Sequence, residues 1–129
     1  FFMPHFILEH SGNLTNESLD LDALFTLLID EAVGTGVFPL AGIRCRAHNC
    51  EYFRVADGTA TFGFVHLHVR IGSGRTEEQK AGAAKVLFGV LTDHLSALYE
   101  SQGLAISFEL TELPVHKFNQ NNLRDYLAK

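Results

Sequence analysis

The Met3-Pro4 pair is the part of this sequence whose residue types are best suited to catalysis. A proline that follows an initiating methionine becomes the first residue once the methionine is removed, and its nitrogen is then a secondary amine. A free α-amino group titrates at roughly pH 7.7–8.0, and a prolyl amine is intrinsically more basic. An apolar pocket or a nearby cation lowers such a pKa toward neutrality, where the amine can act as a general base. The alternative is a proline that merely begins a strand.

Two arginines place positive charge at the ends of conspicuous motifs. Arg44 ends the segment 36–44 (GVFPLAGIR), and Arg75 follows the glycine-rich turn at residues 72–74 (GSG). Guanidinium groups bind carboxylates through charge-assisted hydrogen bonds and stabilise charge that develops on an oxygen. Each arginine is otherwise a solvated surface or interface charge. Arg46 shares a side of its strand with Arg44 and would lengthen a carboxylate-binding surface, so its role stays open.

The sequence gives little support for a metal or an organic cofactor. His66 and His68 lie on one side of an expected strand, but no third ligand follows at a recognisable spacing. They are interpreted as ordinary hydrogen-bonded histidines. The turn at Gly72 and Gly74 lacks the third glycine of a dinucleotide-binding fingerprint and is better explained as turn geometry. We therefore expect neither a metal nor a cofactor.

Composition favours one domain in an intracellular protein. The chain has 129 residues, of which 47% are apolar, and a formal charge of −5 without a basic block, which argues against nucleic-acid binding. Apolar runs stay below the roughly 18 residues that span a bilayer, and no signal peptide is recognisable. Cys45 and Cys50 match no disulfide, zinc or redox spacing and are interpreted as thiols. Eleven Phe favour an oligomer, and we expect a soluble, cytoplasmic protein.

Residue periodicity predicts the elements of the first half. Residues 5–10 form an apolar strand that breaks at a Ser-Gly-Asn turn, and residues 19–33 show helical spacing that ends at two glycines. Residues 40–48 alternate, with Ile43, Cys45 and Ala47 opposite a cationic side formed by Arg44 and its alternate neighbours. Residues 51–55 are a further candidate for a short strand.

The second half repeats this order. Residues 61–71 alternate with one aliphatic side, and a capping box at 76–79 (TEEQ) starts a helix that is expected to reach residue 100. Residues 104–110 alternate in a last strand, and the polar tail from Pro114 contains a possible short helix at 123–127.

The repeated order predicts an α+β, two-layer fold built from a doubled βαβ unit. A strand, helix, strand crossover of this length implies parallel pairing, so two units side by side give a four-stranded sheet with both helices on one face. We expect one domain over residues 4–129, with pseudo-repeats at about 4–55 and 61–113 and a tail at 114–129. The uncovered face is expected to be apolar and buried against another subunit.

Three segments carry a family resemblance: residues 4–9 (PHFILE), 36–44 (GVFPLAGIR) and 71–75 (IGSGR). They closely resemble the 5-carboxymethyl-2-hydroxymuconate isomerase family of the tautomerase superfamily. Residues 74–80 (GRTEEQK) are also similar to the single βαβ unit of 4-oxalocrotonate tautomerase. The resemblance covers nearly the whole chain and implies a tautomerase-like homotrimer that acts as a cofactor-independent isomerase in homoprotocatechuate and related aromatic-acid degradation.

The resemblance also implies roles for individual residues. The Pro4 amine would take a proton from the 2-hydroxy group of a dienol diacid and return one to a distant carbon, giving a conjugated ketone. Arg44 and Arg75 would bind the substrate, a small di- or tricarboxylate. Two alternatives remain open: a superfamily enzyme acting on another keto–enol or halogenated acid, or a catalytically silent trimeric binding protein.

One departure from the family pattern concerns the first three residues. The chain begins Phe1-Phe2-Met3, so the nitrogen of Pro4 is an amide without basicity. Residues 1–3 are interpreted as a remnant of recombinant expression or as an unprocessed start. We expect the natural protein to begin at Pro4.

Overall fold

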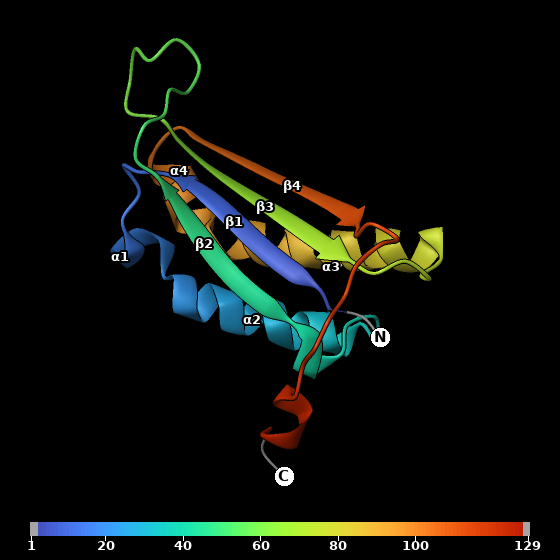
Figure 1. Ribbon diagram of the computed structural model, residues 1–129. Helices are drawn as coiled ribbons and strands as arrows, with labels where there is room; N and C mark the ends of the chain where they lie inside the picture. Colours follow the sequence, from blue (N-terminus) through green and yellow to red (C-terminus); the bar gives the residue numbers. More distant parts are fainter. Residues whose placement is uncertain (1–2, 128–129) are drawn as a thin grey trace.

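Four strands form one mixed sheet, and two long helices cover one of its faces (Figure 1). The structure, a computed structural model, describes residues 3–127. Phe1 and Phe2 of the predicted N-terminal remnant lie outside the described residues. The elements are β1 (His5–Ser11), α1 (Asn16–Leu19), α2 (Leu21–Gly34), the 3-10 turn η1 (Leu40–Gly42), β2 (Arg44–Cys50), β3 (Gly63–Ile71), α3 (Glu77–His94), α4 (Ser96–Ser101), β4 (Leu104–Glu112) and the 3-10 turn η2 (Leu123–Asp125).

The strand order confirms the doubled βαβ unit. The sheet runs β2-β1-β3-β4, with β1 parallel to β2 and β3 parallel to β4. The two units meet at the antiparallel pair formed by β1 and β3. Helices α2 and α3, one from each unit, pack against each other on the same side of the sheet (Figure 1).

Local features of the chain mark where the helices begin and where they are divided. The predicted capping box is present, because the Gln79 backbone N–H donates to Thr76 Oγ1 at 3.0 Å and the Thr76 N–H donates to Gln79 Oε1 at 2.9 Å. The helix expected to run to residue 100 is instead divided at Leu95 into α3 and α4. A left-handed residue, Asp20 with φ of 46°, likewise separates α1 from α2.

Two expected strand segments are absent, and pairing explains both. Residues 40–42 form η1, and β2 starts only at Arg44, opposite the first residue of β1, His5. The β1–β2 ladder ends at Ser11 opposite Cys50, so residues 51–55 continue past the end of the neighbouring strand. Without a partner the backbone there forms no ladder, and the prediction of a strand is wrong.

The core lies between the sheet and the two long helices. The alternation expected for β3 is confirmed, because its odd-numbered residues from Gly63 to Ile71 are buried and its even-numbered ones are half-buried. Burying a large aliphatic or aromatic side chain contributes about 1.5–3 kcal/mol, so this layer supplies the main stabilisation. Fully buried members are Phe6, Leu8, Leu24, Leu28, Val65, Leu67, Val69, Leu87 and Leu91.

The open face of the sheet is polar, so the expectation of an apolar face is wrong. Side chains alternate between the two faces of a strand, and those that point away from the helices are mostly charged or histidine. In the strand register they form three cross-strand rows: Arg44, His5 and Arg70; then Arg46, Ile7, His68 and Glu109; then His48, Glu9, His66 and Ser107. We call these rows the polar face.

The C-terminal tail runs back from the end of β4 and passes the end of the sheet where β1 begins (Figure 1). It places η2 in contact with η1. The short helix expected at 123–127 is present as the 3-10 turn Leu123–Asp125. Within residues 3–127, none of the helices is both long and apolar enough to cross a membrane.

Candidate active site

Pro4 lies immediately before β1, at the end of the sheet that the tail crosses. Its side chain is fully buried, and its carbonyl accepts the Arg44 backbone N–H at 3.2 Å, which ties it to the start of β2. Met3 is also buried, with 4% of its surface exposed. In the chain as given, the Pro4 nitrogen is therefore a tertiary amide covered by Met3, not an accessible amine.

Arg44 brings a positive charge to this position. Its Nη2 donates to the carbonyl of Met3 at 3.1 Å and lies 3.1 Å from His5 Nε2. Its Nε is buried and finds no hydrogen-bond acceptor among residues 3–127. Burial lowers the pKa of Arg44, as does the nearby charge of Arg46. A partly buried guanidinium with an unused donor is suited to receive an anionic group.

His5 is held neutral between cations. Burial and then the charges of Arg44, Arg46 and Arg70 lower its pKa from 6.5 to about 4. Its Nδ1 lies 3.1 Å from Arg46 Nη1 and its Nε2 lies 3.1 Å from Arg44 Nη2. A neutral imidazole has one acceptor nitrogen, so only one of these two contacts is a hydrogen bond donated by arginine.

Arg75 reaches the loop that follows α2. The turn before it depends on Gly74, whose φ of 110° lies in the region that favours glycine. Arg75 Nε donates to the Val37 carbonyl at 3.2 Å, and its Nη2 donates to the same oxygen. The next residue, Phe38, packs its ring edge-on against Phe6 at a centroid distance of 5.6 Å. Arg75 is thereby tied to the loop that packs on β1 just after Pro4.

The remaining residues singled out in the sequence lie on the polar face. Arg46 is exposed and touches His5. His66 contacts Ser107 Oγ at 2.6 Å and Glu109 Oε1 at 3.0 Å, and His68 contacts Thr111 Oγ1 at 2.7 Å. The His66 hydrogen bond, followed by the charge of His68, lowers the pKa of Glu109. Across residues 3–127, no group of three or more His, Cys, Asp or Glu is placed to hold a metal.

Asn121 is a site neighbour that sequence reasoning missed. Its Nδ2 donates to the Ala41 carbonyl at 2.9 Å and lies 3.6 Å from the sulfur of Met3, while its Oδ1 accepts the Leu123 N–H at 2.8 Å. A hollow of about 120 Å³ is bordered by Ala41 and Asn121. The sequence of the tail has no periodic pattern from which this contact could be predicted. His5, also missed, was recognisable from its alternation beside the cationic strand.

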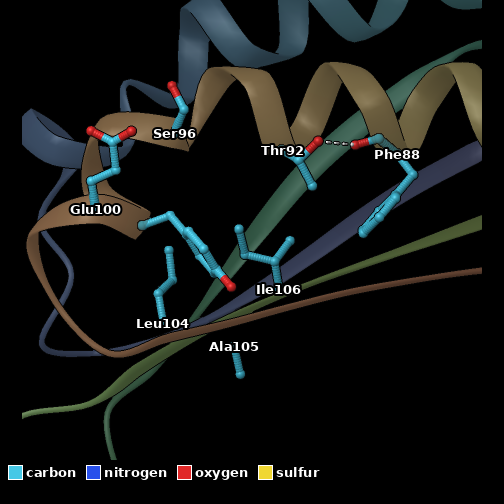
Figure 2. A pocket seen from close by; sticks show the side chains of 8 residues that line it. Phe88, Thr92, Ser96, Glu100, Leu104, Ala105 and Ile106 are labelled. Carbon is cyan, nitrogen blue, oxygen red and sulfur yellow. Dashed lines mark hydrogen bonds between the residues drawn. The ribbon is translucent and has the colours of Figure 1, made fainter.

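A second hollow, of about 470 Å³, lies between α3, α4 and β4 (Figure 2). It is mainly apolar and is lined by Phe88, Thr92, Ser96, Tyr99, Glu100, Leu104, Ala105 and Ile106. Among these lining residues Glu100 carries the only formal charge, and that charge is negative. A substrate with several carboxylates would be repelled there. The candidate active site is therefore the group around Pro4.

Comparisons with known proteins agree with the sequence resemblance. The family model described as 5-carboxymethyl-2-hydroxymuconate isomerase matches residues 4–127. The chain is 44% identical over 122 residues to the 5-carboxymethyl-2-hydroxymuconate Delta-isomerase of Escherichia coli, which covers 94% of this chain and 96% of that protein.

Solved structures show the same fold. A 5-carboxymethyl-2-hydroxymuconate isomerase from Deinococcus radiodurans R1 is similar with a TM-score of 0.87 and 34% identity, over 98% of this chain and 96% of that one. A fused 4-OT symmetric trimer is similar with a TM-score of 0.65 over 84% and 86% of the two chains. At 17% identity this second likeness concerns the fold alone.

Proposed function

This chain belongs to the 5-carboxymethyl-2-hydroxymuconate isomerase family of the tautomerase superfamily, and from that membership we propose that it isomerises 5-carboxymethyl-2-hydroxymuconate to the conjugated keto form. The reaction belongs to the breakdown of homoprotocatechuate and related aromatic acids. The observation that carries the proposal is the family match over residues 4–127, which begins at Pro4.

The proposed reaction is a proton relocation that needs no external oxidant or reductant. The O–H bond of the 2-hydroxy group breaks, the two conjugated C=C bonds shift toward a C2=O bond and a C3=C4 bond, and a C–H bond forms at the carbon that bears the carboxymethyl group. One nitrogen that accepts the first proton and delivers the second is sufficient. We assign this role to the amine of Pro4.

The assignment requires a chain that starts at Pro4. The family match begins at that residue, and Met3, which acylates the Pro4 nitrogen, is buried. Removal of residues 1–3 would turn an amide into an amine and uncover it in one step. The guanidinium of Arg44, which contacts the Met3 carbonyl, would lower the pKa of that amine toward neutrality, because a nearby positive charge disfavours the charged form.

Arg44 and Arg75 are proposed to bind the carboxylates and the developing enolate charge. Arg44 has a buried Nε without an acceptor among residues 3–127, and its Nη2 contacts the carbonyl of the residue that must leave. Arg75 is held side-on by Val37, on the loop that leads through η1 into Arg44. Cationic donors set in place before the reaction need little reorganisation when negative charge develops.

A homotrimer remains our proposal, on different support from that given by the sequence. The polar face gives little apolar surface to bury, whereas exposed apolar side chains gather at the edge formed by α3, α4 and β4. Phe88 is 39% exposed and Tyr99 is 60% exposed, and both border the hollow in Figure 2. Subunit contacts along this edge would remove that surface from water.

We place the enzyme in the cytoplasm. Cys45 and Cys50 are free in the structure. Both lie on β2, at opposite ends of one strand, so they cannot be joined to each other. Free thiols suit a reducing compartment.

The experiment that tests the function compares substrates on the chain that starts at Pro4. Ultraviolet absorbance follows the ketonisation of 5-carboxymethyl-2-hydroxymuconate and of 2-hydroxymuconate, which lacks the carboxymethyl group, and chloride release follows the hydrolytic dehalogenation of a 3-chloroacrylic acid. We expect the highest kcat/KM with the first substrate. Equal or faster turnover of either other compound would favour another superfamily reaction, and binding without turnover of all three would favour a silent binding protein.

A further inference from the structure

The contacts of Met3 identify side chains that lie near the Pro4 nitrogen. Because the Met3 carbonyl carbon is bonded to that nitrogen, every group in contact with Met3 borders the space that the removal of Met3 opens next to the nitrogen. Among residues 3–127, two side chains make polar contacts with Met3: Arg44 Nη2 with its carbonyl oxygen at 3.1 Å, and Asn121 Nδ2 with its sulfur at 3.6 Å. Arg44 already has an assigned role, whereas Asn121 has none.

The Asn121 carboxamide is fixed in orientation by the backbone. Its Oδ1 accepts the Leu123 N–H at 2.8 Å, and its Nδ2 donates to the Ala41 carbonyl at 2.9 Å. An N–H must face an acceptor, so this pair of bonds settles which end of the amide is nitrogen. One of the two Nδ2 hydrogens is used by Ala41, and the other is left for Met3, whose thioether sulfur is a weak acceptor.

We infer that Asn121 is a third substrate-binding residue, which donates its second Nδ2 hydrogen to a substrate carboxylate oxygen once Met3 has been removed. This inference rests on the proposed function. A carboxylate oxygen is a far better acceptor than a thioether, and the amide reaches it without changing its bonds to Ala41 and Leu123. The donor is thus in place before the substrate arrives, and it contacts the same residue, Met3, as Arg44 does.

Asn121 also gives the C-terminal tail a function. The tail is mostly exposed over residues 114–127, yet Asn121 is half-buried and donates to Ala41 in η1, the turn that precedes β2 and Arg44. The tail passes the end of the sheet where β1 begins (Figure 1), and there Asn121 joins it to η1 and to Met3.

The test uses four proteins that all start at Pro4: the wild type, Asn121→Ala, Asn121→Asp and the control Asn119→Ala, which changes an exposed asparagine on the same tail. With 5-carboxymethyl-2-hydroxymuconate, Asn121→Ala should raise KM about tenfold or more with little change in kcat, as expected for a lost bond to a charged group. Asn121→Asp should raise KM further, because its charge repels the substrate. Asn119→Ala should behave as wild type.

The aspartate variant separates binding from tail anchoring. Aspartate keeps an acceptor for the Leu123 N–H but turns a carboxylate oxygen toward the Ala41 carbonyl. A purely structural role therefore predicts a KM penalty that follows the loss of thermal stability across the two variants, whereas repulsion of the substrate predicts a KM penalty beyond it. The additional KM penalty of Asn121→Asp relative to Asn121→Ala should also shrink at about 0.5 M NaCl, because salt screens charge repulsion. Wild-type KM in both Asn121 variants, in an active trimmed enzyme, would overturn the inference and leave the proposed function intact. A trimmed wild type without activity would overturn both.

Discussion

Arg44→Ala, made in the chain that starts at Pro4, should lower kcat/KM by about 30- to 1000-fold. The guanidinium offers Nη2, which loses its Met3 acceptor when residues 1–3 are absent, and a buried Nε without an acceptor among the described residues. One or two charge-assisted bonds to a carboxylate or an oxyanion contribute about 2–4 kcal/mol, and about 1.4 kcal/mol corresponds to a factor of ten. Arg44→Lys keeps the charge but lacks the forked guanidinium, so its kcat/KM should lie between those of the wild type and Arg44→Ala.

Arg70→Ala is the matched control for this prediction. Arg70 also borders His5, from β3, and carries the same charge on the polar face. If substrate binding depends on hydrogen bonds donated by Arg44, then Arg70→Ala should change kcat/KM far less than Arg44→Ala does. The assay follows ketonisation of the dienol at several concentrations, with far-ultraviolet circular dichroism to verify folding. Equal losses in Arg44→Ala and Arg70→Ala would show that only the net charge matters, and wild-type kcat/KM in Arg44→Ala would refute the reasoning.

Three further predictions follow from the same structure. Arg75→Ala should lower kcat/KM by about 30- to 1000-fold, which corresponds to about 2–4 kcal/mol of transition-state stabilisation, with the fold preserved, and wild-type kcat/KM would make Arg75 a surface charge. Sedimentation equilibrium should report three chains of 14.3 kDa each, and a stable monomer at micromolar concentration would remove the trimer. His5 has a pKa lowered to about 4, so the unfolded chain binds more protons and stability should fall as the pH drops from about 6.5 toward 4. His5→Gln should reduce that fall in urea titrations at equal protein concentration, and an unchanged fall would exclude His5 as its cause.

Local patterns predicted the parts of the fold that local chemistry decides. The capping box at Thr76 and Gln79 involves residues three apart, so its two bonds follow from the sequence alone. The alternation of β3 likewise follows from the pleat of a strand buried on one side. The doubled unit was predictable because each half repeats the same order of strand and helix.

Pairing and long-range contacts decided the rest. Residues 51–55 have the composition of a strand, but the neighbouring ladder ends before them. The division at Leu95 escaped periodicity because Leu91 and Leu95 are both buried, so the apolar stripe continues across the break. The contact of Asn121 with Ala41 joins residues 80 positions apart, and no spacing rule reaches that far. Pro4, Arg44 and Arg75 were proposed from the resemblance, not from periodicity.

The central claim is that the base is the amine of Pro4, and one comparison tests it most directly. The turnover of 5-carboxymethyl-2-hydroxymuconate is measured for the 129-residue chain, for the chain that starts at Pro4, and for an equally trimmed Pro4→Ala variant, which keeps a primary amine and an open site. The expected order of kcat is trimmed wild type, trimmed Pro4→Ala, and then the extended chain, which should fold and be nearly inactive. The pH–rate profile of the trimmed wild type should rise near neutrality. An extended chain with the same kcat as the trimmed one would show that the amine is not the base.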